Sequence, residues 1–197
     1  MSDFPMDIPP ISAKAQAIAD DWGFRLSSEP RTGALLRALA ASKPGGRILE
    51  VGIGMGVGAG WLLAGMDQRA RLTGLEIHPE VARLCAELLA DDPRAEVINT
   101  NATAWLEEYT GPPFDLVFVD TTELKFRRRD ILLAHMADGA LLVADDLLPN
   151  DTWTAEHPAR VELFRRDILA EPKLVTTLCD WASGLVVAAY RADGEAA

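Results

Sequence analysis

The sequence contains little cysteine and no long apolar segment. Its two cysteines, Cys85 and Cys179, lie far apart and form no Cys-x-x-Cys pair, which excludes a disulfide framework or a zinc site of the usual ligand spacing. No apolar run approaches the ~20 residues that a membrane helix needs. Residues 1–10 also lack the basic start and apolar core of a signal peptide. We therefore expect a soluble, cytoplasmic protein with no membrane partner.

Positive charge is scarce as well. The chain has 19 Lys and Arg against 30 Asp and Glu, which gives a formal net charge of -11. Because binding to nucleic-acid phosphates requires a concentrated basic surface, this balance argues against a nucleic-acid partner. The local exception is the run Arg127, Arg128 and Arg129, which we interpret as the solvated start of a helix.

The length and composition predict a single domain over residues 1–197. With 49% hydrophobic residues, a chain of this length can bury one substantial core. Residues 1–11 contain three prolines and residues 192–197 are small or polar, so we expect both ends to be flexible.

Helical and extended patterns alternate along the chain. Apolar residues recur at helical spacing in residues 12–22 and 31–41, so two helices are predicted before the first strand. Strands are predicted at 47–51, 71–77, 96–100, 114–119 and 140–144, and helices between them at 60–66, 79–90, 104–109 and 127–136. This alternation predicts a parallel sheet with helices on both faces, a Rossmann-like α/β sandwich of three layers. Residues 173–179 and 185–191 instead read as two strands around a hairpin-like connection.

The most informative motif is a glycine-rich turn directly after the first predicted strand. Gly52, Gly54 and Gly56 follow a buried apolar run and precede a helix. Residues without a Cβ atom allow positive φ values and close approach of a ligand to the backbone. Glu76 ends the next strand about twenty residues later, where a carboxylate can accept hydrogen bonds from both ribose hydroxyls of a nucleoside. The pair predicts a nucleoside-binding site.

A nicotinamide dehydrogenase would normally carry the pattern Gly-x-Gly-x-x-Gly. In this chain the third glycine, Gly56, comes one residue early, and Val57 stands at the dehydrogenase position. Glu50, just before the turn, suits a ligand with an amino group and a sulfonium better than one with two phosphates. The loop therefore favours S-adenosylmethionine (SAM).

Four segments together resemble the class I SAM-dependent methyltransferases, and within them the small O-methyltransferases similar to catechol O-methyltransferase and its bacterial relatives. The segments are LEVGIGMG at 49–56, GLEIHPE at 74–80, FDLVFVD at 114–120 and GALLVADD at 139–146. The resemblance covers roughly residues 29–191. It implies a seven-stranded, mostly parallel sheet whose last strand is antiparallel, in agreement with the hairpin-like end.

The resemblance also implies a set of cofactor contacts. The family's glycine loop surrounds the methionine part of SAM, and later strand ends hold the ribose, the adenine and the floor of the methyl-donor pocket. In this chain those roles fall on Glu50, Gly52, Gly54 and Gly56 for methionine, Glu76 for ribose, Asn101, Ala102 and Thr103 for adenine, and Asp120 for the floor.

Metal-dependent relatives bind a divalent ion through an Asp at the end of the fourth strand and an Asp-Asn pair at the end of the fifth. The corresponding residues here are Asp120, Asp145 and Asp146, and three carboxylates suit Mg²⁺, which prefers oxygen ligands. Asp146 departs from the family's Asn. A metal-independent site, in which Asp145 only caps local N–H groups, stays open as an alternative.

The family's basic Lys, three residues after the first Asp, is replaced by Glu123, and Lys125 stands two residues further on. If Lys125 does not reach the site, the base must be a carboxylate or a histidine, so the candidate catalytic residues are Asp120, Asp146 and His157. Histidine titrates near neutral pH and suits this role. Trp153, in the same long connection at 147–158, is a candidate wall for an aromatic acceptor.

These features predict a SAM-dependent enzyme that methylates a hydroxyl of a small molecule, aromatic acceptors included. Two alternatives remain open: a tRNA-modifying methyltransferase, with Arg127 to Arg129 and Arg165-Arg166 facing the RNA, and a non-catalytic SAM-binding module. Relatives of this type often dimerise through their N-terminal segments, so the resemblance also implies a homodimer.

Overall fold

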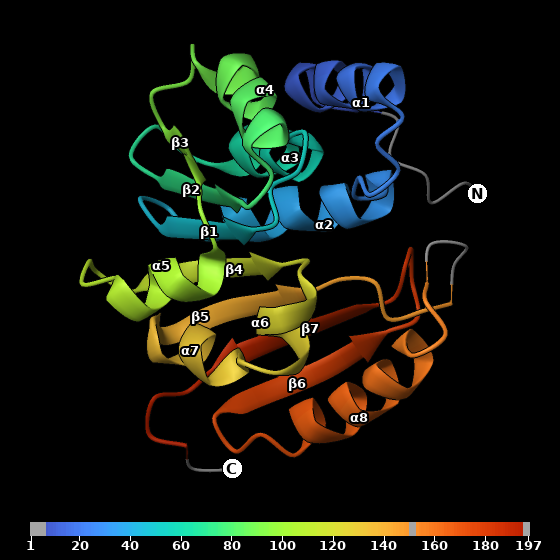
Figure 1. Ribbon diagram of the computed structural model, residues 1–197. Coiled ribbons are helices and arrows are strands. Elements are labelled where there is room, and N and C mark those ends of the chain that lie inside the picture. Colours follow the sequence, from blue (N-terminus) through green and yellow to red (C-terminus); the bar gives the residue numbers. More distant parts are fainter. Residues whose placement is uncertain (1–6, 150–152, 195–197) are drawn as a thin grey trace.

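A seven-stranded sheet runs through the centre of the molecule in the order β3-β2-β1-β4-β5-β7-β6 (Figure 1). The computed structural model describes residues 7–149 and 153–194. The strands are β1 (Arg47–Val51), β2 (Arg71–Glu76), β3 (Ala95–Asn99), β4 (Phe114–Val119), β5 (Met136–Ala144), β6 (Leu174–Cys179) and β7 (Leu185–Tyr190). The helices are α1 (Pro10–Trp22), α2 (Pro30–Ala41), α3 (Val57–Gly65), α4 (Pro79–Leu89), α5 (Ala102–Glu108), α6 (Thr122–Phe126), α7 (Arg129–Ala134) and α8 (His157–Leu169).

The sheet has the predicted mixture of strand directions. Strands β1 to β5 pair in parallel, whereas β7 is antiparallel to both of its neighbours, β5 and β6. The hairpin-like end is confirmed by the pairing of β6 with β7, from Leu174 opposite Tyr190 to Cys179 opposite Leu185. The predicted sheet with an antiparallel last strand and two preceding helices is therefore confirmed.

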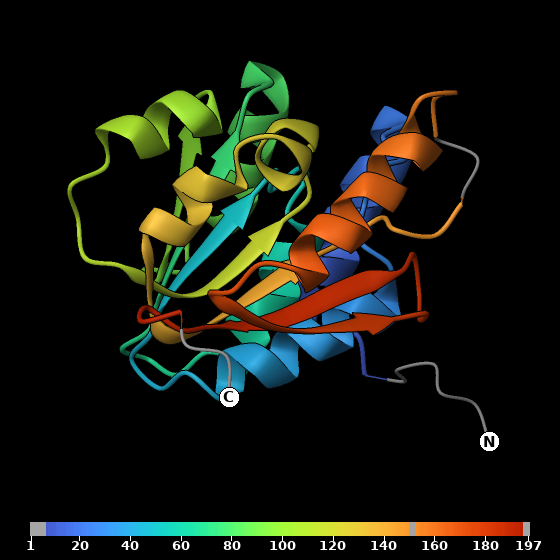
Figure 2. The ribbon, with the colours of Figure 1, turned by 90° about the horizontal axis from the view of Figure 1, so that it is seen from below.

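Alternate residues of the central strands enter two different cores. Leu49 of β1 packs in one apolar cluster with Phe164 of α8, whereas its neighbour Ile48 packs in another with Leu36 of α2 and Leu62 of α3. Successive side chains of a strand point to opposite faces, so a sheet with two apolar faces must be covered on both. Figure 2 shows α2 on one side of the sheet and α8 on the other.

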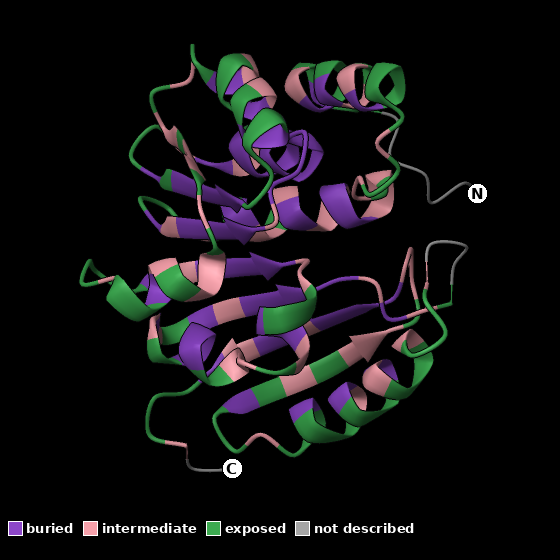
Figure 3. Cartoon of the chain, in the orientation of Figure 1, coloured by how far each residue is buried: buried purple, intermediate pink, exposed green. Residues whose placement is uncertain are grey.

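Helix α3 is enclosed by its neighbours, and Figure 3 shows it buried along almost its whole length. The hydroxyl of Ser12 in α1 donates a hydrogen bond to the carbonyl of Val57 at 3.0 Å. A Cβ atom at Gly60 would collide with Ser12, and one at Gly58 would collide with Glu50 of β1. Close contact with both α1 and the sheet therefore fixes the start of α3 and the glycine turn before it.

The structure corrects the prediction for residues 147–158, which were expected to form one long connection. Helix α8 begins within that span, at His157, and was not predicted. Its buried residues Val161, Phe164 and Ile168 have helical spacing, and Pro158 occupies the first turn, where proline is tolerated. Residues 150–152 of this connection lie outside the described residues.

The predicted flexible ends are also only partly covered by the structure. Residues 1–6 and 195–197 lie outside the described residues, and the first helix begins at Pro10 rather than at residue 12. Among the described residues, no helix combines the length and the apolar character that crossing a membrane would require.

Candidate active site

The glycine turn links β1 to α3 with three left-handed residues. Gly52, Gly54 and Gly56 have φ values of 85°, 54° and 90°. A Cβ atom at Gly52 would lie 2.8 Å from Cγ2 of Thr121 and 3.1 Å from the carbonyl oxygen of Asp120. Glycine is needed there for its positive φ and for the close approach of the chain that follows β4.

Glu76 faces this turn from the end of β2. The backbone N–H of Gly54 donates to its Oε2 at 3.1 Å, and the N–H of His78 donates to its Oε1 at 2.9 Å. These bonds fix the carboxylate at the cavity wall. Each oxygen keeps further lone pairs, so the group can still accept hydrogen bonds from a ligand's hydroxyls.

Asn101 caps the N-terminus of α5. Its Oδ1 accepts hydrogen bonds from the N–H groups of Thr103 at 3.0 Å and Ala104 at 3.2 Å. The cap holds Ala102 and Thr103, which line the same cavity as Glu76, in a fixed position.

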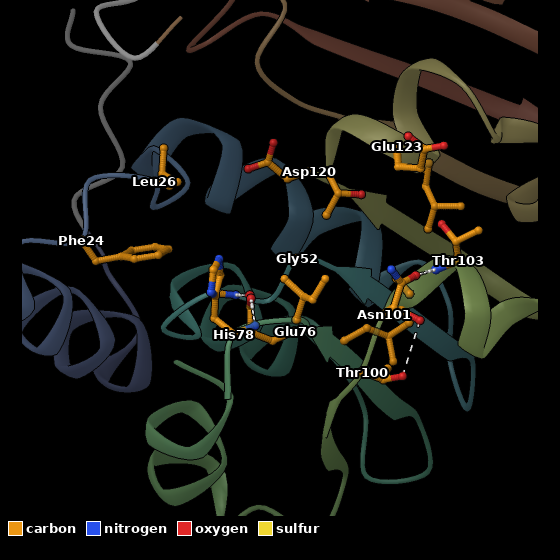
Figure 4. Close-up of a pocket in the computed structure, with 16 residues that line it drawn as sticks. Phe24, Leu26, Gly52, Glu76, His78, Thr100, Asn101, Thr103, Asp120 and Glu123 are labelled. Atoms are coloured by element: carbon orange, nitrogen blue, oxygen red, sulfur yellow. Dashed lines mark hydrogen bonds between the residues drawn. The ribbon is translucent and has the colours of Figure 1, made fainter. Parts of the chain in front are cut away.

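These residues surround a cavity of about 260 Å³ at the carboxyl ends of β1, β2 and β4, hereafter the cofactor cavity. Figure 4 shows Phe24 and Leu26, from the segment between α1 and α2, on the side opposite Asn101 and Thr103. The described residues that line it are Phe24, Leu26, Gly52, Gly54, Leu75, Glu76, Ile77, His78, Thr100, Asn101, Ala102, Thr103, Asp120, Thr121, Glu123 and Leu124.

Two residues of the predicted cofactor set do not line this cavity. Gly56 lies against Cys85 of α4, whose Sγ would be 3.0 Å from a Cβ atom at Gly56. Glu50 lies beneath α3 with only 1% of its surface exposed, and its Oε2 accepts no hydrogen bond from any described residue. Burial raises the pKa of Glu50 well above its ordinary value, and the charge of Asp120 raises it further.

A second cavity, of about 550 Å³, adjoins the first and is hereafter the acceptor cavity. Asp120 and Leu26 line both cavities, so the two spaces meet at these residues. The described residues that line the acceptor cavity are Arg25, Leu26, Ser27, Ser28, Glu29, Asp120, Thr122, Lys125, Asp145, Asp146, Thr154, His157, Arg160 and Ser183. No aromatic ring of Phe, Tyr or Trp is among them.

Lys125 reaches into the acidic part of the acceptor cavity. Its Nζ donates to the carbonyl oxygen of Asp145 at 2.7 Å and lies 3.7 Å from Oδ1 of Asp120. Burial raises the pKa of Asp120, and the Lys125 charge opposes this increase. Burial and the charge of Asp120 raise the pKa of Asp145 to about 7, although hydrogen bonds from Ser183 and the Asp146 N–H oppose the shift. The sequence pattern left it open whether Lys125 reaches the site and gave no signal for Ser183.

Asp146 and His157 form a separate contact at the wall of the same cavity. The Trp153 Nε1–H donates to Oδ1 of Asp146 at 2.8 Å, and Oδ2 lies 3.5 Å from Nε2 of His157. The His157 ring packs between Trp153, at 4.4 Å between centroids, and Phe126, at 5.4 Å. Trp153 therefore contacts His157 and Asp146 rather than lining the cavity as predicted.

The three carboxylates predicted to bind Mg²⁺ do not fit a metal ion. Asp145 accepts hydrogen bonds from Ser183 and from the Asp146 N–H, Asp146 faces Trp153 and His157, and Lys125 places an ammonium group beside Asp120. In keeping with this, the described part of the chain contains no group of three His, Cys, Asp or Glu residues arranged to hold a metal. The predicted metal site at Asp120, Asp145 and Asp146 is thus not supported.

Residues 49–147, half of the chain, match the family model described as "Methyltransferase domain". The chain belongs to this methyltransferase family. Membership confirms the resemblance drawn from the four motifs and sets aside the nicotinamide dehydrogenase alternative.

Similar proteins agree with this assignment. A Mycobacterium tuberculosis protein named as a probable O-methyltransferase is 38% identical over 114 residues, which are 56% of this chain and 50% of that protein. The chain spans about half the length of the curated relatives that it matches.

Solved structures share the fold of this chain. The O-methyltransferase from Bacillus cereus, in complex with SAH, aligns with a TM-score of 0.81 and 21% identity over 96% of this chain and 93% of that one. The O-methyltransferase TomG from Streptomyces achromogenes, involved in tomaymycin synthesis and in complex with SAM, aligns with a TM-score of 0.80 and 22% identity over 96% and 92%.

Proposed function

We propose that this methyltransferase transfers a methyl group from SAM to a hydroxyl oxygen of a small, polar molecule. The observation that carries the proposal is the position of Asp120, which lines both the cofactor cavity and the acceptor cavity. A transfer between two bound molecules requires that their reacting atoms meet at one place, and the two cavities meet there. The names of the similar O-methyltransferases support oxygen as the acceptor atom.

The cofactor cavity offers groups suited to each part of SAM. Glu76 accepts hydrogen bonds from the ribose hydroxyls, because its carboxylate is held at the wall by backbone N–H donors. The adenine lies against Asn101, Ala102 and Thr103, and the methionine part follows Gly52 and Gly54 along the turn.

Glu50 is the proposed partner of the amino group of SAM. Its buried Oε2 accepts no hydrogen bond from any described residue, and the positive charge of a nearby ammonium group would favour the ionised form of its carboxylate. Because Glu50 lies behind the cavity lining, we infer that it acts on the methionine part from beneath the turn. Gly56 serves the turn and its contact with Cys85 rather than touching SAM.

When bound, SAM supplies the methyl group: the acceptor oxygen bonds to the methyl carbon as the carbon–sulfur bond breaks. The electron pair of the broken bond stays on sulfur. The proton of the acceptor hydroxyl passes to a protein carboxylate. We assign that carboxylate to Asp120, whose raised pKa suits a group that takes up a proton. Asp146 and His157 contact each other at the cavity wall, and we propose that they position the acceptor.

The lining of the acceptor cavity favours a polar acceptor over an aromatic one. Eight of its fourteen described lining residues are ionisable, and three more are serines. Charged groups and hydroxyls offer hydrogen-bond partners, so this lining favours a molecule with several hydroxyl or charged groups.

Three of the five arginines named for a tRNA substrate form surface ion pairs with acidic side chains of the protein itself. Arg127 pairs with Glu123 at 3.5 Å, Arg128 with Glu107 at 3.3 Å, and Arg165 with Asp180 at 3.3 Å. The tRNA alternative thus gains no support, and the non-catalytic alternative is weakened by the acceptor cavity beside the cofactor cavity.

Calorimetric titration with SAH tests the cofactor half of the proposal. We expect Glu76→Ala to weaken SAH binding roughly tenfold or more, because a charge-assisted hydrogen-bond acceptor is lost. Glu80→Ala, which removes an exposed carboxylate of α4 that pairs with Arg83, is the matched control and should bind as the wild type does. Wild-type protein that binds no SAH would overturn the proposed function.

A transfer assay tests the acceptor half. The protein is incubated with SAM labelled in its methyl group and with polar hydroxy compounds, each set beside its analogue lacking the hydroxyl. We expect label only in hydroxyl-bearing products. Label in the analogues would overturn oxygen as the acceptor atom.

A further inference from the structure

Lys125 is a buried lysine in a cavity that is otherwise rich in carboxylates. Only 3% of its surface is exposed, although lysine is almost never fully buried without a partner. It lies on the short helix α6, which directly follows the strand that ends before Asp120. Something specific must therefore compensate for removing its charge from water.

The compensation comes from the acceptor cavity itself. The Lys125 Nζ donates to the Asp145 carbonyl at 2.7 Å, lies 3.7 Å from Oδ1 of Asp120, and stands 5.0 Å from the centroid of the Phe126 ring. Two oxygen atoms and an aromatic face thus surround one ammonium group. Because Lys125 also lines the cavity, the third direction is open to a bound molecule.

The Lys125 ammonium lies between Oδ1 of Asp120 and the backbone carbonyl of Asp145, at the wall of the acceptor cavity. A divalent ion placed between these two residues would lie within a few ångströms of the ammonium and would be repelled by it. Two further oxygens of the cluster already accept hydrogen bonds: Oδ1 of Asp145 from Ser183 and the Asp146 N–H, and Oδ1 of Asp146 from Trp153. The cluster therefore already contains one positive charge of the chain itself, held beside Asp120 and the Asp145 carbonyl.

We propose that the Lys125 ammonium is the cation of the acceptor site, that it binds the acceptor oxygen directly, and that the site excludes divalent metal ions. This inference rests on the proposed function for the identity of the acceptor. Its metal-excluding part is a property of the cluster and can be measured without SAM or an acceptor. The positive charge that contacts the acceptor oxygen is then the Lys125 side chain and not a bound metal ion.

The test uses Mn²⁺ as the probe. Binding of MnCl₂ alone is followed by the electron paramagnetic resonance signal of free Mn²⁺ for the wild type, Lys125→Ala and Lys14→Ala. Lys14→Ala removes an exposed lysine of α1 and is the matched control. We expect wild type and control to leave the Mn²⁺ signal unchanged. Lys125→Ala should bind Mn²⁺ roughly tenfold or more tightly than the wild type, since the carboxylates then lack their cation.

Two further measurements keep the test decisive. Lys125→Arg keeps the positive charge and should bind no more Mn²⁺ than the wild type, which separates the loss of charge from a disturbed fold. SAH affinity, measured on the same samples, reports on the cofactor cavity and hence on the proposed function separately. Wild-type protein that binds Mn²⁺ as tightly as Lys125→Ala, or a Lys125→Ala protein that binds SAH normally but gains no Mn²⁺ affinity, would overturn the inference.

Discussion

The two cavities of this protein are built in different ways. The cofactor cavity is shaped by backbone: a turn with three positive φ values, a carboxylate held by two N–H groups, and a helix N-terminus capped by Asn101. The acceptor cavity is shaped by side chains that interact with one another, with Lys125 placed between Asp120 and Asp145. The backbone groups of the cofactor cavity suit one fixed ligand. A few side-chain substitutions in the acceptor cavity, by contrast, would change which molecule it binds.

Asp120→Asn should give the largest change in the rate of methyl transfer. It should also distinguish the role of the acceptor cavity from that of the cofactor cavity. The amide cannot take up the acceptor proton, so we expect the rate of methyl transfer to fall about 100-fold or more. The affinity for SAH should stay within a factor of about three, because the cofactor cavity keeps its backbone contacts. Labelled methyl transfer and calorimetry measure the two quantities, with the exposed Asp91→Asn as control. A variant with a normal rate would remove Asp120 from the mechanism.

Gly52→Ala should affect the cofactor cavity most strongly. The added Cβ would enter contact with Thr121 at 2.8 Å and would also force alanine into a φ of 85°. We expect SAH affinity to fall by a factor of roughly ten or more. Gly139→Ala carries the same kind of backbone strain, at a φ of 75°, but its Cβ meets nothing within 4 Å. If both variants bound SAH equally well, the close approach at Gly52 would have no role in binding.

Asp145→Asn should produce a smaller effect that depends on pH. The pKa of Asp145 is raised to about 7 in the fold, so the folded state holds this proton more tightly than the unfolded state does. Its contribution to the free energy of unfolding is therefore greatest below about pH 4 and is lost as the pH rises through about 7. Asparagine keeps the Oδ1 that accepts from Ser183 and from the Asp146 N–H.

Thermal unfolding over this pH range measures the difference between Asp145→Asn and the wild type. We expect the Tm of the variant to rise relative to the wild type between about pH 4 and 7, and the difference to stay constant above that. Asp130→Asn, at an exposed position of α7, controls for the loss of one surface charge. Parallel Tm profiles for Asp145→Asn and the wild type would mean that Asp145 ionises normally in the fold.

The contrast between the cavities also explains what could be predicted from the sequence. The glycine turn and Glu76 follow directly from local order along the chain, since a strand end, a turn and a helix start lie within a few residues. Strands β1 and β4 have the predicted bounds, because short apolar runs between turn residues mark buried strands clearly.

The acceptor cavity could not be predicted in the same way. Ser183 contacts Asp145 across 38 positions of sequence, and Lys125 contacts it across 20. Such contacts depend on how β5, α6 and the hairpin between β6 and β7 pack, which no local pattern encodes. The metal interpretation of the three carboxylates gains no support for the same reason: the carboxylates and Lys125 were visible in the sequence, but the position of the Lys125 ammonium beside Asp120 was not.

Helix α3 has a consequence for how the molecule assembles. It is nine residues long and contains Gly58, Gly60 and Gly65, each of which costs a helix about 1 kcal/mol relative to alanine. A helix this short and this rich in glycine has little stability of its own. Its stability therefore comes from packing against α1, α2 and β1, and the turn that precedes it depends on the same contacts. A ligand held by this turn would thus stabilise contacts between helices that are far apart in the sequence, and not the turn alone.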